Sequence, residues 1–130
     1  MKTDKQMKGT LGEDAVCAEL KRRGHRILER NYRRRCGEID IISEIGDYIV
    51  FTEVKARKTG SMVSGLEAVD PAKKKKIIMT ADAYLTENPC RSYVRYDIAE
   101  VRLTKESVPR VSGIDIYEDA FDTEGIYTIN

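Results

Sequence analysis

The chain has 130 residues, of which 41% are hydrophobic and 35% are charged, with a formal net charge of +1. This length suits one hydrophobic core, so we expect a single domain over residues 1–130. Three cysteines without a CxxC pair argue against a disulfide framework, and a single histidine excludes His-rich zinc sites and most His-based triads. No apolar run is long enough to span a membrane, so we expect a cytoplasmic protein with no membrane partner.

Basic and acidic residues are unevenly distributed along the chain. Residues 1–58 contain fourteen Lys or Arg and ten acids, whereas the acidic C-terminal segment, 113–130, contains five acids and no base. This asymmetry favours a polyanionic partner at one face of the molecule. Solvated helix faces explain charge runs equally well when the runs are considered alone.

The first half of the chain predicts one helix and three strands. A flexible start is expected over residues 1–9. Thr10 then serves as the N-cap with Glu13 as its capping-box partner, and the helix ends before Gly24. Strands are predicted at Arg26–Arg33, Glu38–Ile45 and Tyr48–Ala56, with a Gly46-Asp47 turn between the last two.

The second half predicts another helix and two strands. The helix begins at Asp70-Pro71, because Asp is a good N-cap and Pro suits the first helical position, and it ends near Asn88-Pro89. The other expected segments are a flexible loop at Lys58–Gly65, a strand at Tyr93–Leu103, a flexible loop at 104–112, a short strand at Ile114–Tyr117 and one helical turn around Ala120-Phe121. The order α-β-β-β-α-β-β is typical of an α/β domain with a mixed central sheet flanked by helices.

Charged side chains interrupt the apolar pattern of the second and third strands. In an alternating strand, Glu53 and Lys55 share a face with Phe51, where core residues are expected. Asp40 lies in the isoleucine-rich strand of the same hairpin, so the three charged groups are able to converge. Two carboxylates and a lysine are typical of a divalent metal site with an activated water. By spacing alone, a surface salt bridge explains the Glu53–Lys55 pair at least as well, and an edge position or Asx turn is the alternative for Asp40.

Glu13 is a fourth candidate for this site. The apolar residues Val16, Cys17 and Leu20 follow it at helical spacing, so Glu13 shares their stripe. A carboxylate on a buried face needs a cation or a metal as its partner. The capping box with Thr10 is an equally good explanation of a Glu at this position.

These motifs resemble the PD-(D/E)XK metal-dependent nucleases, with Ile39-Asp40 in place of Pro-Asp and Glu53-Val54-Lys55 as the second half. The chain is more closely similar to the small bacterial YraN-like family, which itself resembles the archaeal Holliday junction resolvases. The matching segments are Gly12-Glu13, Gly24, Arg30-Asn31-Tyr32, Gly37-Glu38-Ile39-Asp40, Phe51-Thr52-Glu53-Val54-Lys55-Ala56-Arg57, Ala68-Val69 with Lys73, and Tyr96-Asp97. The resemblance implies a restriction-endonuclease-like core.

The resemblance also implies a role for each site residue. Asp40 and Glu53, with the Val54 carbonyl, would ligate Mg²⁺ or Mn²⁺. Lys55 would orient the attacking water or neutralise the phosphate, and Glu13 would hold a metal-bound water or a second ion. The implied catalytic set is therefore Glu13, Asp40, Glu53 and Lys55.

Basic residues that flank these motifs fit a nucleic-acid partner. The candidates for phosphate contacts are Arg33, Arg34, Arg35, Arg57 and Lys73. Lys73 begins the second helix, where the free N–H groups favour phosphate. Such contacts provide affinity without reading base sequence. A solvated helix face is an equally good explanation of the basic run Lys73–Lys76.

We therefore predict a Mg²⁺- or Mn²⁺-dependent endonuclease acting on DNA, with branched or structured DNA favoured. Similarity to junction resolvases suggests a homodimer, because paired cuts on a two-fold substrate need two sites. One alternative is a non-catalytic nucleic-acid-binding protein that retains the nuclease fold. A glycoside hydrolase is a weaker alternative, because its cleft should carry aromatics and the chain has no Trp and two Phe.

Overall fold

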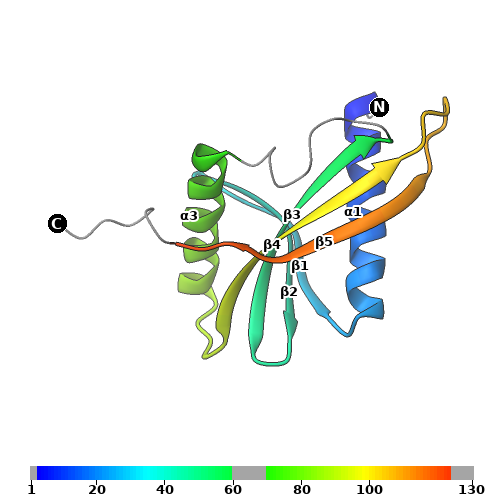
Figure 1. The fold of residues 1–130 in the computed structure, drawn as a ribbon. Helices are drawn as coiled ribbons and strands as arrows, with labels where there is room; N and C mark the ends of the chain where they lie inside the picture. The colour runs from blue at the N-terminus through cyan, green and yellow to red at the C-terminus, as the bar shows by residue number, and fades with distance from the viewer. Residues whose placement is uncertain (1–2, 60–69, 124–130) are drawn as a thin grey trace.

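A computed structural model describes residues 3–59 and 70–123, which form a mixed sheet with a helix on each face (Figure 1). The elements in chain order are α1 (Asp4–Arg22), β1 (Arg26–Arg34), β2 (Gly37–Ile45), β3 (Tyr48–Lys58), α3 (Pro71–Glu87), β4 (Tyr93–Leu103) and β5 (Val111–Phe121). The predicted α/β class and the α-β-β-β-α-β-β order are confirmed. No helix within the described ranges is long and apolar enough to cross a membrane.

The five strands lie in sequence order across the sheet. β1, β2 and β3 form an antiparallel meander, whereas β3 and β4 run parallel from Tyr48↔Tyr93 to Lys58↔Leu103. A parallel pair requires a crossover connection, and the chain makes it through α3. β5 then returns antiparallel to β4, so the sheet is mixed, as predicted.

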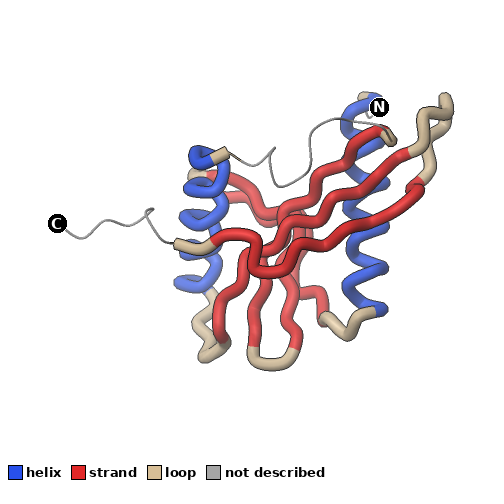
Figure 2. The backbone as a smooth tube through the Cα atoms, viewed as in Figure 1, coloured by secondary structure: helices blue, strands red, loops and turns tan. Residues whose placement is uncertain are grey.

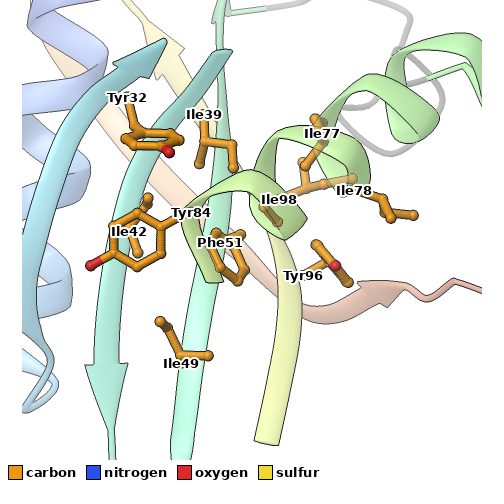
Figure 3. Packing of buried hydrophobic residues seen from close by; sticks show 11 residues of the cluster. Tyr32, Ile39, Ile42, Ile49, Phe51, Ile77, Ile78, Tyr84, Tyr96 and Ile98 are labelled. Atoms are coloured by element: carbon orange, nitrogen blue, oxygen red, sulfur yellow. The ribbon is translucent and has the colours of Figure 1, made fainter. Parts of the chain in front are cut away.

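The two helices cover opposite faces of the sheet (Figure 2). Under α3 lies an aromatic-rich core, where the ring of Phe51 is 6.0 Å from Tyr84 and 5.8 Å from Tyr96 (Figure 3). Under α1 lies an aliphatic core that includes Val16, Leu20, Ile41, Ala99 and Val101. Phe51 belongs to the first core and Val54 packs against the second, so β3 contributes to both.

α1 begins earlier than the sequence predicted. Thr3 is its N-cap, and the Thr3 hydroxyl and the Gln6 side chain form a capping box with 3.1 and 2.8 Å hydrogen bonds. The helix start at Thr10 is therefore wrong, and the flexible start over residues 1–9 is corrected from residue 4 onward. Thr3-x-x-Gln6 is as good a capping signature as Thr10-x-x-Glu13, and the earlier one adds nearly two turns of helix. The predicted end is confirmed, because Gly24 follows the helix with a φ of +100°.

Gly37 begins β2 in close contact with α3. A Cβ at this position would approach the Thr80 hydroxyl to 3.0 Å, and φ is +155°. The predicted strands of the meander are confirmed, although β1 extends to Arg34 and β3 to Lys58. The Gly46-Asp47 turn is confirmed by a Gly46 φ of +55°.

α3 begins and ends as predicted. Asp70 caps it, accepting a 2.8 Å hydrogen bond from the Lys73 N–H, and Pro71 occupies the first turn. The loop predicted at Lys58–Gly65 lies outside the described residues from position 60.

β5 is longer than the short strand predicted at Ile114–Tyr117. It begins at Val111, so the loop expected at 104–112 ends at residue 110, and it reaches Phe121, so the helical turn around Ala120-Phe121 is wrong. Phe121 stacks on Tyr96 of β4 with ring centroids 5.2 Å apart. A register shift in this part of the β4–β5 pairing, together with a φ of +52° at Asp119, interrupts the alternation and hides the strand in the sequence.

Candidate functional site

Asp40 lies at the point where β2 and β3 stop pairing. The backbone ladder between these strands ends at Ile41↔Thr52. Beyond that pair, the Asp40 carboxylate accepts a hydrogen bond from the Val54 N–H, with 2.7 Å between Oδ2 and N. This bond fixes the carboxylate against β3, beside Glu53. The structure thus gives the Val54 N–H a role in placing Asp40, and the ligand role of the Val54 carbonyl stays a prediction.

Glu53 is a buried carboxylate that faces two lysines. Its side chain is 5% exposed, and its Oε1 lies 3.5 Å from the Lys55 Nζ and 3.3 Å from the Lys73 Nζ. Lys55 is two residues further along the same strand, as the alternation predicted, and Lys73 comes from the first turn of α3. An ion pair on a solvent-exposed strand does not describe this arrangement, because Glu53 is in the protein interior.

The carboxyl group of Asp40 has a raised pKa. Burial and the nearby Glu53 charge raise the pKa of Asp40 to about 8, with smaller contributions from Glu13 and Glu38, against the opposing hydrogen bond from Val54. When no cation is present, burial and the Glu53 charge therefore favour the protonated form of Asp40. The half-buried Asp40 and the buried Glu53 repel each other in this way, and such a pair of carboxylates is a favourable place for a divalent cation.

Glu13 reaches this region because α1 lies close to β3. A Cβ on the preceding residue, Gly12, would be 3.2 Å from the Ala56 Cβ and 3.7 Å from Val54 Cγ1, so a glycine permits this approach. Glu13 and Asp40 line the same groove. The capping-box explanation of Glu13 is wrong, because Thr3 caps the helix.

The pKa of the Glu13 carboxyl is also raised. Burial is the largest cause, and Glu38 adds to it, whereas the Arg30 charge and a hydrogen bond from the Asn31 side chain lower it. Glu13 therefore belongs to the same cluster of interacting acids as Asp40.

The groove beside these acids has a volume of about 890 Å³. It is lined by Lys5, Gln6, Gly9, Thr10, Glu13 and Asp14 of α1, Arg30, Asn31 and Arg33 of β1, and Glu38 and Asp40 of β2. Glu53 and Lys55 are not among the lining residues. Glu53 is paired with Lys73 of α3, and α3 covers the face of the sheet opposite to α1. Asp40 thus lies between the groove and the buried Glu53.

Three of the five predicted phosphate-binding residues have partners within the protein. Lys73 contacts Glu53, as described above. Arg33 lines the groove and pairs with Glu38 at 3.3 Å. Arg34 instead makes a bidentate pair with Glu87, at 2.8 and 2.7 Å.

The other two predicted phosphate-binding residues, Arg35 and Arg57, differ in exposure. Arg35 is exposed in the β1–β2 turn. The Arg57 Nε is buried and has no hydrogen-bond partner among the described residues.

Sequence reasoning assigned no function to several groove residues. They include Lys5 and Gln6 on α1 and Arg30 and Asn31 on β1. The segment Arg30-Asn31-Tyr32 matches the YraN-like pattern, and this signal marks the part of β1 that lies beside Asp40.

The described residues contain no group of three or more His, Cys, Asp or Glu side chains arranged to hold a metal ion. A full protein cage is not required for Mg²⁺, which keeps several waters and is commonly bound through one or two carboxylates. Asp40 and Glu53 supply two hard oxygen ligands whose mutual repulsion a cation would relieve, so the residues present fit such an ion.

Comparison with known proteins assigns the chain to a family. A model described as "Uncharacterised protein family UPF0102" matches residues 12–101, a range that includes Glu13, Asp40, Glu53 and Lys55. A UPF0102 protein of Syntrophus aciditrophicus is 42% identical over 115 residues, covering 88% of this chain and 87% of the relative. Similar proteins of Chlorobium phaeobacteroides and Acetivibrio thermocellus are 39% and 41% identical, covering 95% and 92% of this chain and 100% and 95% of their own lengths. The chain belongs to the UPF0102 family, and its resemblance to the YraN-like proteins is confirmed.

Proposed function

We propose that this protein is a divalent-metal-dependent endonuclease that hydrolyses phosphodiester bonds in DNA, with branched or otherwise structured DNA as the favoured substrate. The observation that carries the proposal is the hydrogen bond from the Val54 N–H to Asp40, which brings one carboxylate beside the buried Glu53 and its two lysines. The resemblance to PD-(D/E)XK nucleases supports the reaction type.

Asp40 and Glu53 would hold Mg²⁺ or Mn²⁺. Lys55 lies 3.5 Å from the Glu53 carboxylate. The bound cation would lower the pKa of a water molecule and polarise the scissile phosphate. Lys55 and Lys73 would then turn their ammonium groups from Glu53 to the charge that develops on the phosphate. Glu13, across the groove, would accept a hydrogen bond from a water at the reacting centre.

The protonation of Asp40 makes cation binding sensitive to pH. With a pKa of about 8, the Asp40 carboxyl must release its proton before it acts as a ligand. We therefore expect affinity for Mn²⁺ to increase as the pH rises from 6 to 8.

The proposed setting is the cytoplasm, with two copies acting together on a two-fold substrate. The symmetry of a branched junction favours this arrangement, because each copy supplies one active site. Sedimentation of the protein with and without a four-way junction measures the stoichiometry directly.

The test is a panel of labelled branched, duplex and single-stranded DNAs incubated with Mg²⁺ or Mn²⁺. Asp40→Asn preserves the side-chain shape and the acceptor for Val54 but removes the charge, so it should abolish cleavage. Asp47→Asn is the matched control, since Asp47 is exposed in the turn of the same hairpin. Cleavage that persists in Asp40→Asn would identify a contaminating nuclease and refute the proposal.

A non-catalytic nucleic-acid-binding protein is the second candidate. It is favoured by the observation that Lys55 and Lys73 already balance the negative charge of Glu53, so this charge needs no metal cation as its partner. Calorimetric titration with Mn²⁺ separates the candidates. If no binding depends on Asp40 and Glu53, the nuclease proposal should be abandoned in favour of this one.

A further inference from the structure

The backbone of Asn31 has an unusual conformation. Its φ is +52°, in the left-handed region that is uncommon for residues other than glycine, although asparagine adopts it more readily than most. Among the described non-glycine residues, Asp119 is the other one with a positive φ. Such strain persists where the surrounding structure imposes it, and it is frequent at functional sites.

Asn31 also occupies a central place in the groove. The β1–β2 pairs on either side of it place Asn31 opposite Asp40. Asn31, Asp40 and Glu13 all line the groove, each from a different element. The strained residue is therefore next to the acids that the proposed reaction uses.

The Asn31 side chain interacts with the carboxyl group of Glu13. Glu13 of α1 and Asn31 of β1 line the same groove, and a hydrogen-bonding interaction with the Asn31 side chain lowers the pKa of the Glu13 carboxyl. The neighbouring Arg30 is bonded to Asp14 of the same helix, with 2.7 Å between Nη2 and Oδ1. Adjacent residues of β1 thus interact with adjacent acids of α1: Arg30 through its charged guanidinium and Asn31 through its neutral amide.

The neutral amide of Asn31 is suited to a carboxylate that must keep its negative charge. An amide supplies N–H donors without a positive charge, so it orients a carboxylate without neutralising it. A lysine or arginine at position 31 would pair with Glu13 and compete with any cation or ordered water.

We propose that Asn31 is a positioning residue that orients the Glu13 carboxylate toward Asp40. Its catalytic consequence rests on the proposed nuclease function, whereas its action on Glu13 does not.

Asn31→Gly is the decisive variant, because glycine adopts the same φ without strain and the change removes the side chain that carries the amide. Asp119→Gly is the matched control: it relieves a φ of the same value on β5, and Asp119 lines a separate hollow. Both variants should melt close to the wild-type temperature. On the best DNA substrate, Asn31→Gly should lower kcat by about 10-fold or more with little change in KM, and Asp119→Gly should retain wild-type kinetics.

A double-mutant cycle with Glu13→Gln tests whether Asn31 acts through Glu13. If it does, the double variant Glu13→Gln with Asn31→Gly should be no slower than Glu13→Gln alone. A wild-type kcat for Asn31→Gly, or a further loss in the double variant, overturns the proposal.

A metal-free measurement separates this inference from the proposed function. Removal of the Asn31 donor should raise the pKa of the Glu13 carboxyl, measured by ¹³C NMR titration, and Asp119→Gly should leave it unchanged. If the wild-type protein cleaves no DNA but this shift occurs, the nuclease proposal fails and the positioning of Glu13 stands. If the Glu13 pKa is the same in Asn31→Gly and the wild type, the positioning role is refuted whatever the activity.

Discussion

The ammonium group of Lys73 lies 3.3 Å from the buried Oε1 of Glu53, although twenty residues and a change of element separate them in the chain. Lys55 contacts the same oxygen at 3.5 Å. A single carboxylate oxygen thus faces two cations, which compensate Glu53 when no metal ion is bound. The two lysines and a divalent cation should therefore compete for Glu53.

Replacement of Lys73 by methionine should strengthen metal binding. The change removes one competitor for Glu53, so we expect the Kd for Mn²⁺, measured by calorimetry, to decrease several-fold. The cost in folding stability should stay below about 3 kcal/mol, because Lys55 still pairs with the buried Glu53 after the change. Lys75→Met, an exposed position on the same helix, serves as the control. Weaker Mn²⁺ binding in Lys73→Met would show that Lys73 supports the site rather than competing with the cation.

Asp40→Asn should change the pH dependence of stability in metal-free buffer. The pKa of Asp40 is raised in the folded state, to about 8, so its contribution to stability is fully present below the unfolded pKa near 4 and is lost as the pH rises through 8. The asparagine variant does not lose this stability as the pH rises, because its side chain does not titrate. We expect it to gain roughly 1–3 kcal/mol over the wild type between pH 5 and pH 8, after allowance for relaxation around a buried charge.

Urea unfolding with a chelator at the two pH values measures this difference. Addition of Mn²⁺ at pH 8 should then stabilise the wild type and leave Asp40→Asn unchanged, because only the wild type binds the ion. Parallel stability curves for the two proteins across this range would show that Asp40 has an ordinary pKa.

Local rules in the sequence were sufficient for most of the fold. The Gly46-Asp47 turn, the Asp70-Pro71 helix start and the alternation of β3 each depend on a few adjacent residues, and each is confirmed. β5 was mispredicted because its length depends on pairing with β4, which no local pattern encodes. The start of α1 was mispredicted because two capping signatures of equal quality occur seven residues apart.

The arrangement of the candidate site residues was predictable where they lie within one hairpin. The proximity of Asp40, Glu53 and Lys55 followed from strand alternation across a two-residue turn. The contact between Lys73 and Glu53 was not predictable, because it depends on how α3 crosses the sheet. The N–H of Val54 was also missed, since only the separation of β2 from β3 makes that donor available to a side chain.

The close approach of α1 to β3 should make Gly12 sensitive to substitution. In Gly12→Val, the added atoms would overlap with Ala56 and move the helix outward, at a cost of roughly 1–3 kcal/mol in unfolding free energy. Cleavage should fall more than stability alone explains, because Glu13 moves with the helix. Gly9→Ala is the control, since its Cβ meets nothing within 4 Å, and we expect it to stabilise the helix by about 0.5–1 kcal/mol. Equal stability of Gly12→Val and the wild type would show that α1 and β3 accommodate a larger side chain between them.

Arg33 and Arg34 should differ in function although they are adjacent. Arg33 lines the groove and is 74% exposed, with one long pair to Glu38. Arg34 is bonded to Glu87, which also accepts a 2.8 Å hydrogen bond from the Tyr32 hydroxyl, and its guanidinium lies 4.2 Å from the Tyr32 ring centroid. The first arginine is therefore available to a phosphate, and the second is bound within the protein.

Arg33→Ala should weaken binding to all DNA sequences alike and reduce the slope of log K against log salt by about 1, as expected for the loss of one phosphate contact. Its melting temperature should match the wild type. Arg34→Ala should lower the melting temperature and leave the salt slope unchanged, because the change breaks the link between β1 and the end of α3. Fluorescence anisotropy with a labelled junction over a range of salt concentrations measures the slopes. An equal reduction of the slope in both variants would place Arg34 in the DNA interface as well.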